Sequence, residues 1–233
     1  IAIENGELEM YYLPEMDIRC GKIIGADGLL RCNHPVRGLV GAGEFLPFAE
    51  EIGLIMPISD WMLGALCRDV KTWAELGGEH VCLSLNVSPQ YLDRGDFTEK
   101  IAGAMREHGV SPKQIEVEIT ENICIRNPHE AIAQLKKLNQ AGFSVAIDDF
   151  GTGYSSLSYL KSLPIDVIKI DQSFVRDILS SQNAAAIAQT IVTLAHSLGL
   201  TVIAEGVETE QQREFLLQAG CLAYQGYLFC KPI

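Results

Sequence analysis

Apolar residues along the chain follow two alternating patterns, which predict strands and helices in turn. Short apolar runs of the length expected for buried β-strands occur eight times. Between most of these runs, apolar residues recur at steps of three and four, as on one face of an α-helix. The eight predicted strands cover residues 8–13, 23–30, 81–88, 115–120, 144–150, 166–171, 201–206 and 223–229.

The helical pattern is clearest in three segments, and no linker, low-complexity stretch or charge block divides the chain. Asn183 can cap the last of the three helices and Gly199 can end it. We therefore expect a single domain over residues 1–233. The three helical segments are residues 58–76, the stretch that opens at Asn127-Pro128 and closes at Ala141-Gly142, and residues 183–198.

Eight strands with intervening helices predict an α/β fold, a modified TIM (β/α)8 barrel. Only residues 14–22 separate the first two strands, which is too short for a helical crossover. These two strands should pair as a hairpin, so that strand 1 runs antiparallel in an otherwise parallel barrel. A doubly wound open sheet is the alternative, but no G-x-G-x-x-G motif follows the early strands.

Composition and charge narrow the class of protein. The 233 residues are 48% hydrophobic and 21% charged, which is ordinary for a globular protein with a large core. The formal net charge is −12 without a run of like charges, which argues against a DNA-binding surface. Seven widely spaced cysteines, without a C-x-x-C pair, favour a reducing, cytoplasmic environment over disulfides or zinc.

Polar side chains gather at the carboxyl ends of the predicted strands. In a barrel these ends converge on one face, where catalytic residues collect. Several carboxylates in one place need a counter-charge, and oxygen ligands without a Cys or His cluster favour Mg²⁺ or Mn²⁺. The residues are Asn86, Glu118, Asp148, Asp149, Lys169, Asp171, Glu205 and Gln225.

Some of these residues also have an ordinary structural explanation. The pair Asp148-Asp149 could form a turn or cap a helix, Lys169 could be half of an ion pair, and Glu118 could be a solvated barrel residue. Their joint occurrence on successive strand ends favours a site. A residue shared between two metal ions about 3.5–4 Å apart would explain the paired aspartates.

Six motifs follow one another along the chain: "LNVSPQYL" (85–92), "EITE" (118–121), "DDFGTGYSSL" (148–157), "IKIDQSFV" (168–175), "AEGVET" (204–209) and "QGYLFCKP" (225–232). In this order they resemble the EAL domain, the bacterial phosphodiesterase module that linearises cyclic di-GMP to pGpG. The resemblance implies a barrel with an antiparallel first strand, two Mg²⁺ or Mn²⁺ ions and a homodimer. Because the chain opens on Ile1, we expect a domain excised from a longer protein, with sensory or GGDEF domains and any membrane anchor outside it.

The resemblance also implies a role for each residue at a matching position. The metal ligands would be Asp27, Asn86, Glu118, Asp148 and Asp149. The catalytic residues would be Glu205 as a ligand or general base, Lys169 and Asp149. The substrate would contact Arg31, Asp171, Gln225 and Gly226. A mobile active-site loop, supported by Glu121, would comprise Phe150, Gly151, Thr152 and Gly153.

Two departures from the family pattern bear on activity. The Glu-Ala-Leu triplet is Asp27-Gly28-Leu29 here. Asp27 keeps the charge, but its side chain is shorter by roughly 1.3 Å, and a misplacement near 1 Å can cost about a hundredfold in rate. Leu13 stands where the family has Gln, so that a polar contact near the substrate is lost.

Two hypotheses follow for the function. In the first, the domain is a metal-dependent phosphodiesterase in which a metal-activated water attacks cyclic di-GMP, with activity reduced by Asp27 and Leu13. In the second, it is a degenerate EAL domain that binds cyclic di-GMP and signals through a dimer. Lys169 and Glu205 favour the enzyme, because a receptor has no need of a water-activating set. Enolase-like proton abstraction accounts less well for the paired aspartates.

Overall fold

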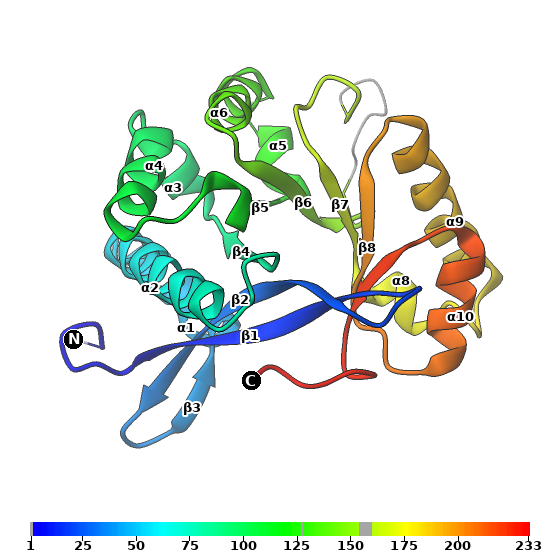
Figure 1. Cartoon of the computed structure of the whole chain (residues 1–233), viewed down its shortest axis with the longest axis horizontal. Helices are drawn as coiled ribbons and strands as arrows, with labels where there is room; N and C mark the ends of the chain where they lie inside the picture. Colours follow the sequence, from blue (N-terminus) through cyan, green and yellow to red (C-terminus); the bar gives the residue numbers. More distant parts are fainter. Residues whose placement is uncertain (1, 127, 154–159) are drawn as a thin grey trace.

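The computed structural model describes residues 2–126, 128–153 and 160–233. Eight of its strands form a closed ring, with the helices outside (Figure 1). The ring runs in the order β1-β9-β8-β7-β6-β5-β4-β2 and closes where β1 pairs with β2. The bounds are β1 Leu8–Asp17, β2 Ile23–His34, β4 Cys82–Asn86, β5 Ile115–Thr120, β6 Ser144–Phe150, β7 Val167–Ile170, β8 Thr201–Ala204 and β9 Ala223–Gln225.

The first strand is antiparallel to both of its neighbours, β2 and β9, whereas β2 and β4 to β9 run parallel to one another. The predicted barrel with an antiparallel first strand is therefore confirmed. The strands differ from the prediction in their bounds, and β9, for example, ends at Gln225 and not at residue 229. Strands β1 and β2 continue beyond the predicted 8–13 and 23–30, and an extra short strand, β3 (Gly38–Gly41), pairs with the far end of β2.

Helices α2, α6 and α9 match the three segments with the clearest helical pattern, although Asn127 itself lies outside the described residues. The cap of α9 differs from the prediction: Ser181, not Asn183, accepts the hydrogen bond from Ala184 N at the start of this helix. The helical elements are α1 Ala42–Glu51, α2 Ile55–Glu75, α3 Pro89–Leu92, α4 Phe97–His108, the 3₁₀ turn η1 Pro112–Gln114, α5 Glu121–Arg126, α6 Pro128–Gln140, α8 Gln172–Arg176, α9 Gln182–Ser197 and α10 Glu210–Ala219. None of the helices described has the length and apolar character that crossing a membrane requires.

Alternation along the strands separates the two faces of the barrel wall. Outward residues pack with the helices in one large core, as Val145 and Ile147 of β6 do. A second, small apolar cluster lies among the inward residues and consists of Ala146, Val167, Ile203 and Ala223. Because inward positions recur every second residue, the next inward residue on each of these strands is two positions further on. Those residues are Asp148, Lys169, Glu205 and Gln225.

Candidate active site

A cavity of about 420 Å³ opens where the carboxyl ends of the barrel strands meet. Asn86 and Gln225 are the last residues of β4 and β9, and Glu205 follows β8 directly. Asp148 lies near the end of β6, and Asp27 comes from β2 beside β4. The cavity thus brings together six of the residues predicted for the site: Asp27, Asn86, Asp148, Glu205, Gln225 and Gly226.

Asp148, Asp149 and Glu205 form an acidic cluster, the acidic rim, at this end of the barrel. One carboxylate oxygen of each residue lies within 4.8 Å of those of the other two. Burial, followed by the charges of Asp148 and Asp171, raises the pKa of Asp149 to about 6. Burial also raises the pKa of Asp148 and of Glu205. Three carboxylates that are costly to ionise together provide a strong reason for cations to bind here.

The backbone of Asp149 is left-handed, with φ at 54°, and this is the only positive φ outside glycine among the described residues. Aspartate tolerates this conformation better than most residues because its short polar side chain can bond locally. Here the Asp149 N–H donates to Asp148 Oδ1 at 2.8 Å, and the Thr152 hydroxyl donates to the Asp149 carbonyl at 2.8 Å. The turn therefore presents both aspartates at the end of β6.

Lys169 on β7 lies beneath the acidic rim and is fully buried. Its ammonium forms ion pairs with Glu118, with Glu15 Oε1 at 3.2 Å and with Asp27 Oδ2 at 3.9 Å. Burial acts to lower the pKa of Lys169, but the Glu118, Asp27 and Glu15 carboxylates outweigh it and hold the pKa well above its usual range. Lys169 is thus a charged ammonium, suited to neutralising an anionic oxygen and not to accepting a proton.

Glu118 on β5 has the features of a metal ligand. It is 1% exposed, and within the described part of the chain its Oε2 accepts no hydrogen bond. Burial, followed by the charge of Asp27, raises the pKa of Glu118 well above its usual range. A buried carboxylate oxygen without a donor is a natural ligand for a hard divalent cation. The residues present therefore fit Mg²⁺ or Mn²⁺.

Asp27 and Asn86 meet across the two neighbouring strands, β2 and β4. Asn86 Nδ2 donates to Asp27 Oδ1 at 2.8 Å and lies 3.4 Å from the Gly28 carbonyl. A Cβ at Gly28 would lie 2.7 Å from the Ser84 carbonyl oxygen and 3.1 Å from Leu66 Cδ1 of α2. Strand β2 therefore lies closer to its neighbours at this point than an alanine would permit.

Gln225 and Gly226 close the cavity on the side of β9. Gln225 Nε2 donates to Glu205 Oε1 at 2.6 Å, which fixes the orientation of that carboxylate. Gly226 has φ at 150°, and a Cβ there would lie 2.3 Å from both the N and the O of Val207. Glycine at this position lets the chain after β9 pass against the backbone that follows β8.

Glu121, the first residue of α5, contacts the start of the predicted loop. Its Oε2 accepts hydrogen bonds from Gly151 N at 2.9 Å and Gly153 N at 3.3 Å. A Cβ at Gly153 would lie 2.6 Å from Glu121 Oε1, so a larger residue there would displace this carboxylate. Residues 154–159 lie outside the described residues. The predicted mobility of this loop stays a prediction, while the support by Glu121 has a geometric basis.

Two predicted substrate contacts, Arg31 and Asp171, are not among the residues that line the cavity, although the charge of Asp171 acts on Asp149 in the acidic rim. Arg31 Nη1 donates to the Leu30 carbonyl at 2.9 Å, and its guanidinium lies over the Tyr11 ring at 5.7 Å. Asp171 caps α8: its Oδ1 accepts from Ser173 N at 3.0 Å and from the Ser173 hydroxyl. Both residues have local partners that account for their positions without a substrate.

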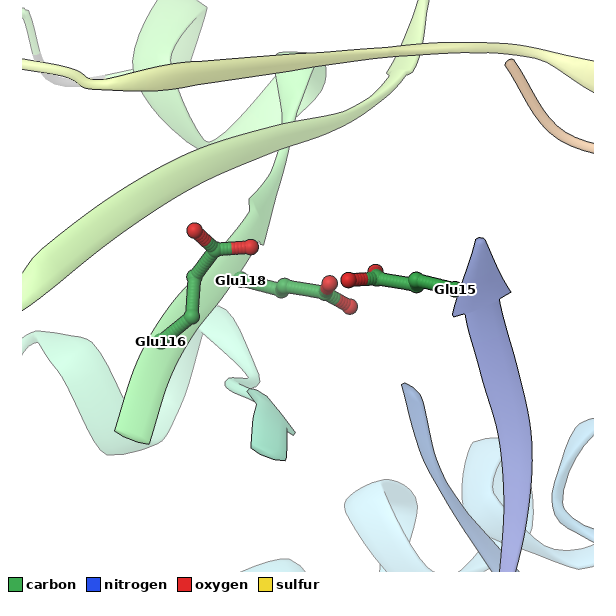
Figure 2. A group of neighbouring side chains, drawn as sticks. All are labelled: Glu15, Glu116 and Glu118. Carbon is green, nitrogen blue, oxygen red and sulfur yellow. The ribbon is translucent and has the colours of Figure 1, made fainter. Parts of the chain in front are cut away.

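Glu15 and Glu116 lie beside Glu118 in the barrel interior, although neither was predicted from the sequence. Figure 2 shows the Glu15 carboxylate, from β1, pointing at that of Glu118, with Glu116 beside it on β5. One oxygen of each lies within 4.8 Å of those of the other two. Glu116 shares the inward parity of Glu118, which could have identified it. Glu15 lies in the part of β1 beyond the predicted strand, so parity gave no signal there.

Glu116 should make the stability of the domain depend on pH. Burial, followed by the charge of Glu15, raises its pKa to about 7, against about 4.3 in an unfolded chain. The folded protein therefore binds more protons between these values, and the free energy of unfolding falls as pH rises through the window. Glu116→Gln should flatten this dependence and raise stability at pH 8 by about 1–3 kcal/mol.

Urea unfolding of the metal-free protein at pH 5 and pH 8 would measure this effect. Glu99→Gln, on the exposed face of α4, removes the same charge and serves as the control. If Glu116→Gln kept the pH dependence of the original protein, the buried carboxyl would not be its source.

Two relatives from Pseudomonas aeruginosa show what the chain is similar to. NbdA, a cyclic di-GMP phosphodiesterase, is 39% identical over 232 residues, which cover 100% of this chain and 30% of NbdA. MucR, a bifunctional diguanylate cyclase/cyclic di-GMP phosphodiesterase, is 38% identical over 232 residues, which cover 100% of this chain and 34% of MucR. The chain thus spans about a third of the length of these curated relatives.

A solved structure and a family model also match this chain. The solved structure of the MucR phosphodiesterase in its c-di-GMP complex matches with a TM-score of 0.96 at 38% identity, covering 100% of this chain and 94% of that chain. The family model described as the EAL domain matches residues 1–232. The predicted resemblance is therefore confirmed, and the chain belongs to the EAL domain family.

Proposed function

We propose that this domain hydrolyses cyclic di-GMP to linear pGpG with the help of divalent cations. The observation that carries the proposal is the acidic rim above the buried ammonium of Lys169, at the mouth of a cavity. Such a site can bind cations and an anionic phosphodiester together. The names of NbdA and MucR, and the c-di-GMP complex of the latter, support the choice of substrate.

Two ions, Mg²⁺ or Mn²⁺, would be held by residues with oxygen donors. Bound there, they would lower the pKa of a water molecule and stabilise charge on the leaving oxygen. The Glu118 Oε2 atom, which is buried without a hydrogen-bond donor in the described residues, supports this assignment. We assign the ligands as Asp27, Asn86, Glu118, Asp148 and Asp149, with Glu205 at the edge of the set.

The side chains of the site can carry out the proton and charge transfers of hydrolysis. Glu205, held by Gln225, would accept a proton from the attacking water as the new P–O bond forms. The bond from phosphorus to the ribose oxygen breaks, and that oxygen takes up a proton from solvent. Lys169 would offset the negative charge that grows on the phosphate oxygens.

The second candidate is a receptor that binds cyclic di-GMP without cleaving it. Asp27 and Leu13 both line the cavity, so the two departures from the family pattern act at the site itself. An assay of pGpG formation with Mg²⁺ or Mn²⁺, against a chelator-treated control, separates the candidates. Product that depends on the metal supports the enzyme. Calorimetric binding of cyclic di-GMP without product at high protein concentration would establish the receptor.

Asp27→Glu should raise turnover if the shortened ligand limits the rate. The longer side chain restores roughly 1.3 Å of reach, and a gain of about tenfold or more is expected from the sensitivity of rate to such displacements. The matched control is Gly28→Ala, which restores the other residue of the family triplet. It should not raise turnover, because its Cβ would lie 2.7 Å from the Ser84 carbonyl oxygen. Initial rates of pGpG formation test both, and equal rates for Asp27→Glu and the original protein would contradict the prediction.

We also propose that the domain works as a homodimer in the cytoplasm, as part of a longer protein with sensory or GGDEF domains. The share of MucR and NbdA that the chain covers supports the further domains. Light scattering of the domain at several concentrations would measure its oligomeric state.

A further inference from the structure

Glu15 is an acidic residue of the barrel interior for which the proposed reaction has no role. It lies on β1, the antiparallel strand, and is 4% exposed. Its carboxylate points across the barrel at that of Glu118 (Figure 2). The ammonium of Lys169 pairs with both, at 3.2 Å from Glu15 Oε1. Lys169 therefore joins two carboxylates that would otherwise repel each other.

The carboxylates that pair with Lys169 differ in whether they are also assigned to a metal ion. Glu118 and Asp27 are assigned to the divalent cations, and a carboxylate that binds a metal is a weaker partner for an ammonium. A buried ammonium without a counter-charge is costly. Of the three carboxylates that form ion pairs with Lys169 in the described residues, Glu15 alone has no assignment to metal.

The neighbouring strand provides room for Glu15. Gly25 of β2 is the Cα partner of Glu15 in the β1–β2 pairing. A Cβ at Gly25 would lie 2.3 Å from Glu15 Oε2 and 3.0 Å from the Cys82 carbonyl oxygen. Any other residue would displace the carboxylate. Gly25 of β2 therefore leaves open the space that the Glu15 carboxylate of β1 occupies.

We propose that Glu15 is a positioning residue, which holds the ammonium of Lys169 at the floor of the site while Glu118 and Asp27 bind cations. Without Glu15, the ammonium would pair with Glu118 and Asp27 alone and compete with the cations for these oxygens. The proposal rests on the proposed function for its effect on turnover. Its effect on metal affinity can be measured whether or not the domain cleaves cyclic di-GMP.

Glu15→Gln tests the proposal because it keeps the size of the side chain and removes its charge. We expect the Kd for Mg²⁺, measured by calorimetry, to rise about tenfold, as is typical for loss of a group that supports metal ligands. The kcat should fall about tenfold with an unchanged KM, because the lost interaction acts on the reacting phosphate through Lys169.

Glu116→Gln is the matched control. Glu116 belongs to the same group of three glutamates, but its carboxylate accepts a hydrogen bond from the Ser144 hydroxyl at 2.7 Å and forms no ion pair with Lys169. The Kd of the Glu116→Gln variant for Mg²⁺ should therefore stay within about threefold of the original value. Equal losses in Glu15→Gln and Glu116→Gln would overturn the proposal, since the effect would then follow from net charge alone.

A second comparison locates the effect at Lys169. In a Lys169→Met background no ammonium competes for the ligands, so Glu15→Gln should leave the Kd for Mg²⁺ unchanged. Gly25→Ala, which displaces the Glu15 carboxylate and keeps every charge, should weaken Mg²⁺ binding in the original background. If Glu15→Gln left Mg²⁺ affinity and turnover intact in an active domain, this inference would fail and the proposed hydrolysis would stand. If neither the original protein nor any variant cleaved cyclic di-GMP, the proposed hydrolysis would fail. The Mg²⁺ affinities would still decide the role of Glu15.

Discussion

Lys169→Met should reduce turnover by about 10²–10³-fold, the loss seen when a group that stabilises transition-state charge is removed. The ammonium is fully buried and its pKa is well above the usual range, so it is charged at every working pH. No other lysine or arginine forms an ion pair with Glu15, Glu118 or Asp27 in the described residues. The rate of pGpG formation under saturating Mg²⁺ measures the effect.

The same substitution should also destabilise the metal-free protein. It would leave Glu15 and Glu118 buried without a counter-charge, which typically costs about 3–5 kcal/mol. Mg²⁺ should restore part of this stability, because a cation that binds only the folded protein stabilises it. Thermal unfolding with and without Mg²⁺ would show the recovery. Lys136→Met, on the exposed face of α6, is the control, and full turnover in Lys169→Met would remove this lysine from the mechanism.

Glu205→Gln should reduce turnover by about 10²–10⁴-fold while cyclic di-GMP still binds, as expected for loss of a general base. The amide cannot accept a proton from water, although it keeps the shape of the side chain beside Gln225. Glu214→Gln, on the exposed part of α10, removes the same charge far from the chemistry and should be neutral. Comparable losses of nucleotide affinity and turnover in Glu205→Gln would instead identify a binding residue.

The pKa of Glu205 gives this prediction a pH dependence. Burial, followed by the charge of Asp148, raises the pKa, and the base is active only when ionised. The rate should therefore rise with pH on the acidic side of the profile. A bound cation favours the ionised form, so saturating Mg²⁺ should move this rise to lower pH than limiting Mg²⁺. Profiles of kcat/KM at two Mg²⁺ concentrations would test the direction of the shift.

Strand alternation made much of the site predictable from the sequence. Asp148 and Glu205 follow apolar strand residues at inward positions, and the parallel strands bring them to one end of the barrel. Asn86 and Gln225 could be placed in the same way. The prediction needed only the strand boundaries and the period of two, because closure of the barrel then brings the inward residues at the strand ends together.

The proline at position 14 explains why Glu15 could not be found in this way. Proline usually ends a strand pattern because it cannot donate to the ladder. In the structure, β1 continues through Pro14 to Asp17, while its pairing with β9 begins only at Glu15. Tyr12 N, on the same side of β1 as the nitrogen of Pro14, bonds to Ile233 O and not to β9. At Pro14 the strand thus behaves as an edge, a fact that depends on tertiary pairing.

Local partners of some predicted residues could not be predicted from the sequence. Nothing in the spacing of Arg31 or Asp171 indicates that the first contacts a carbonyl and a tyrosine ring, or that the second caps α8. The contact of Gly28 with Ser84 and α2 likewise depends on how closely three elements pack. Such contacts are set by the distances between elements, which the residue pattern of one segment does not contain.

The left-handed backbone at Asp149 limits how this position can vary. Among substitutions at Asp149, compatibility with the left-handed backbone decides which variants form the turn, and the charge matters only among those that do. β-branched residues strain such a turn, whereas asparagine and glycine do not. Loss of activity in most members of a library of such substitutions would therefore not separate misfolding of the turn from loss of the metal ligand. Asparagine is the informative replacement, because it alone removes the charge while keeping both the shape and the side-chain oxygen.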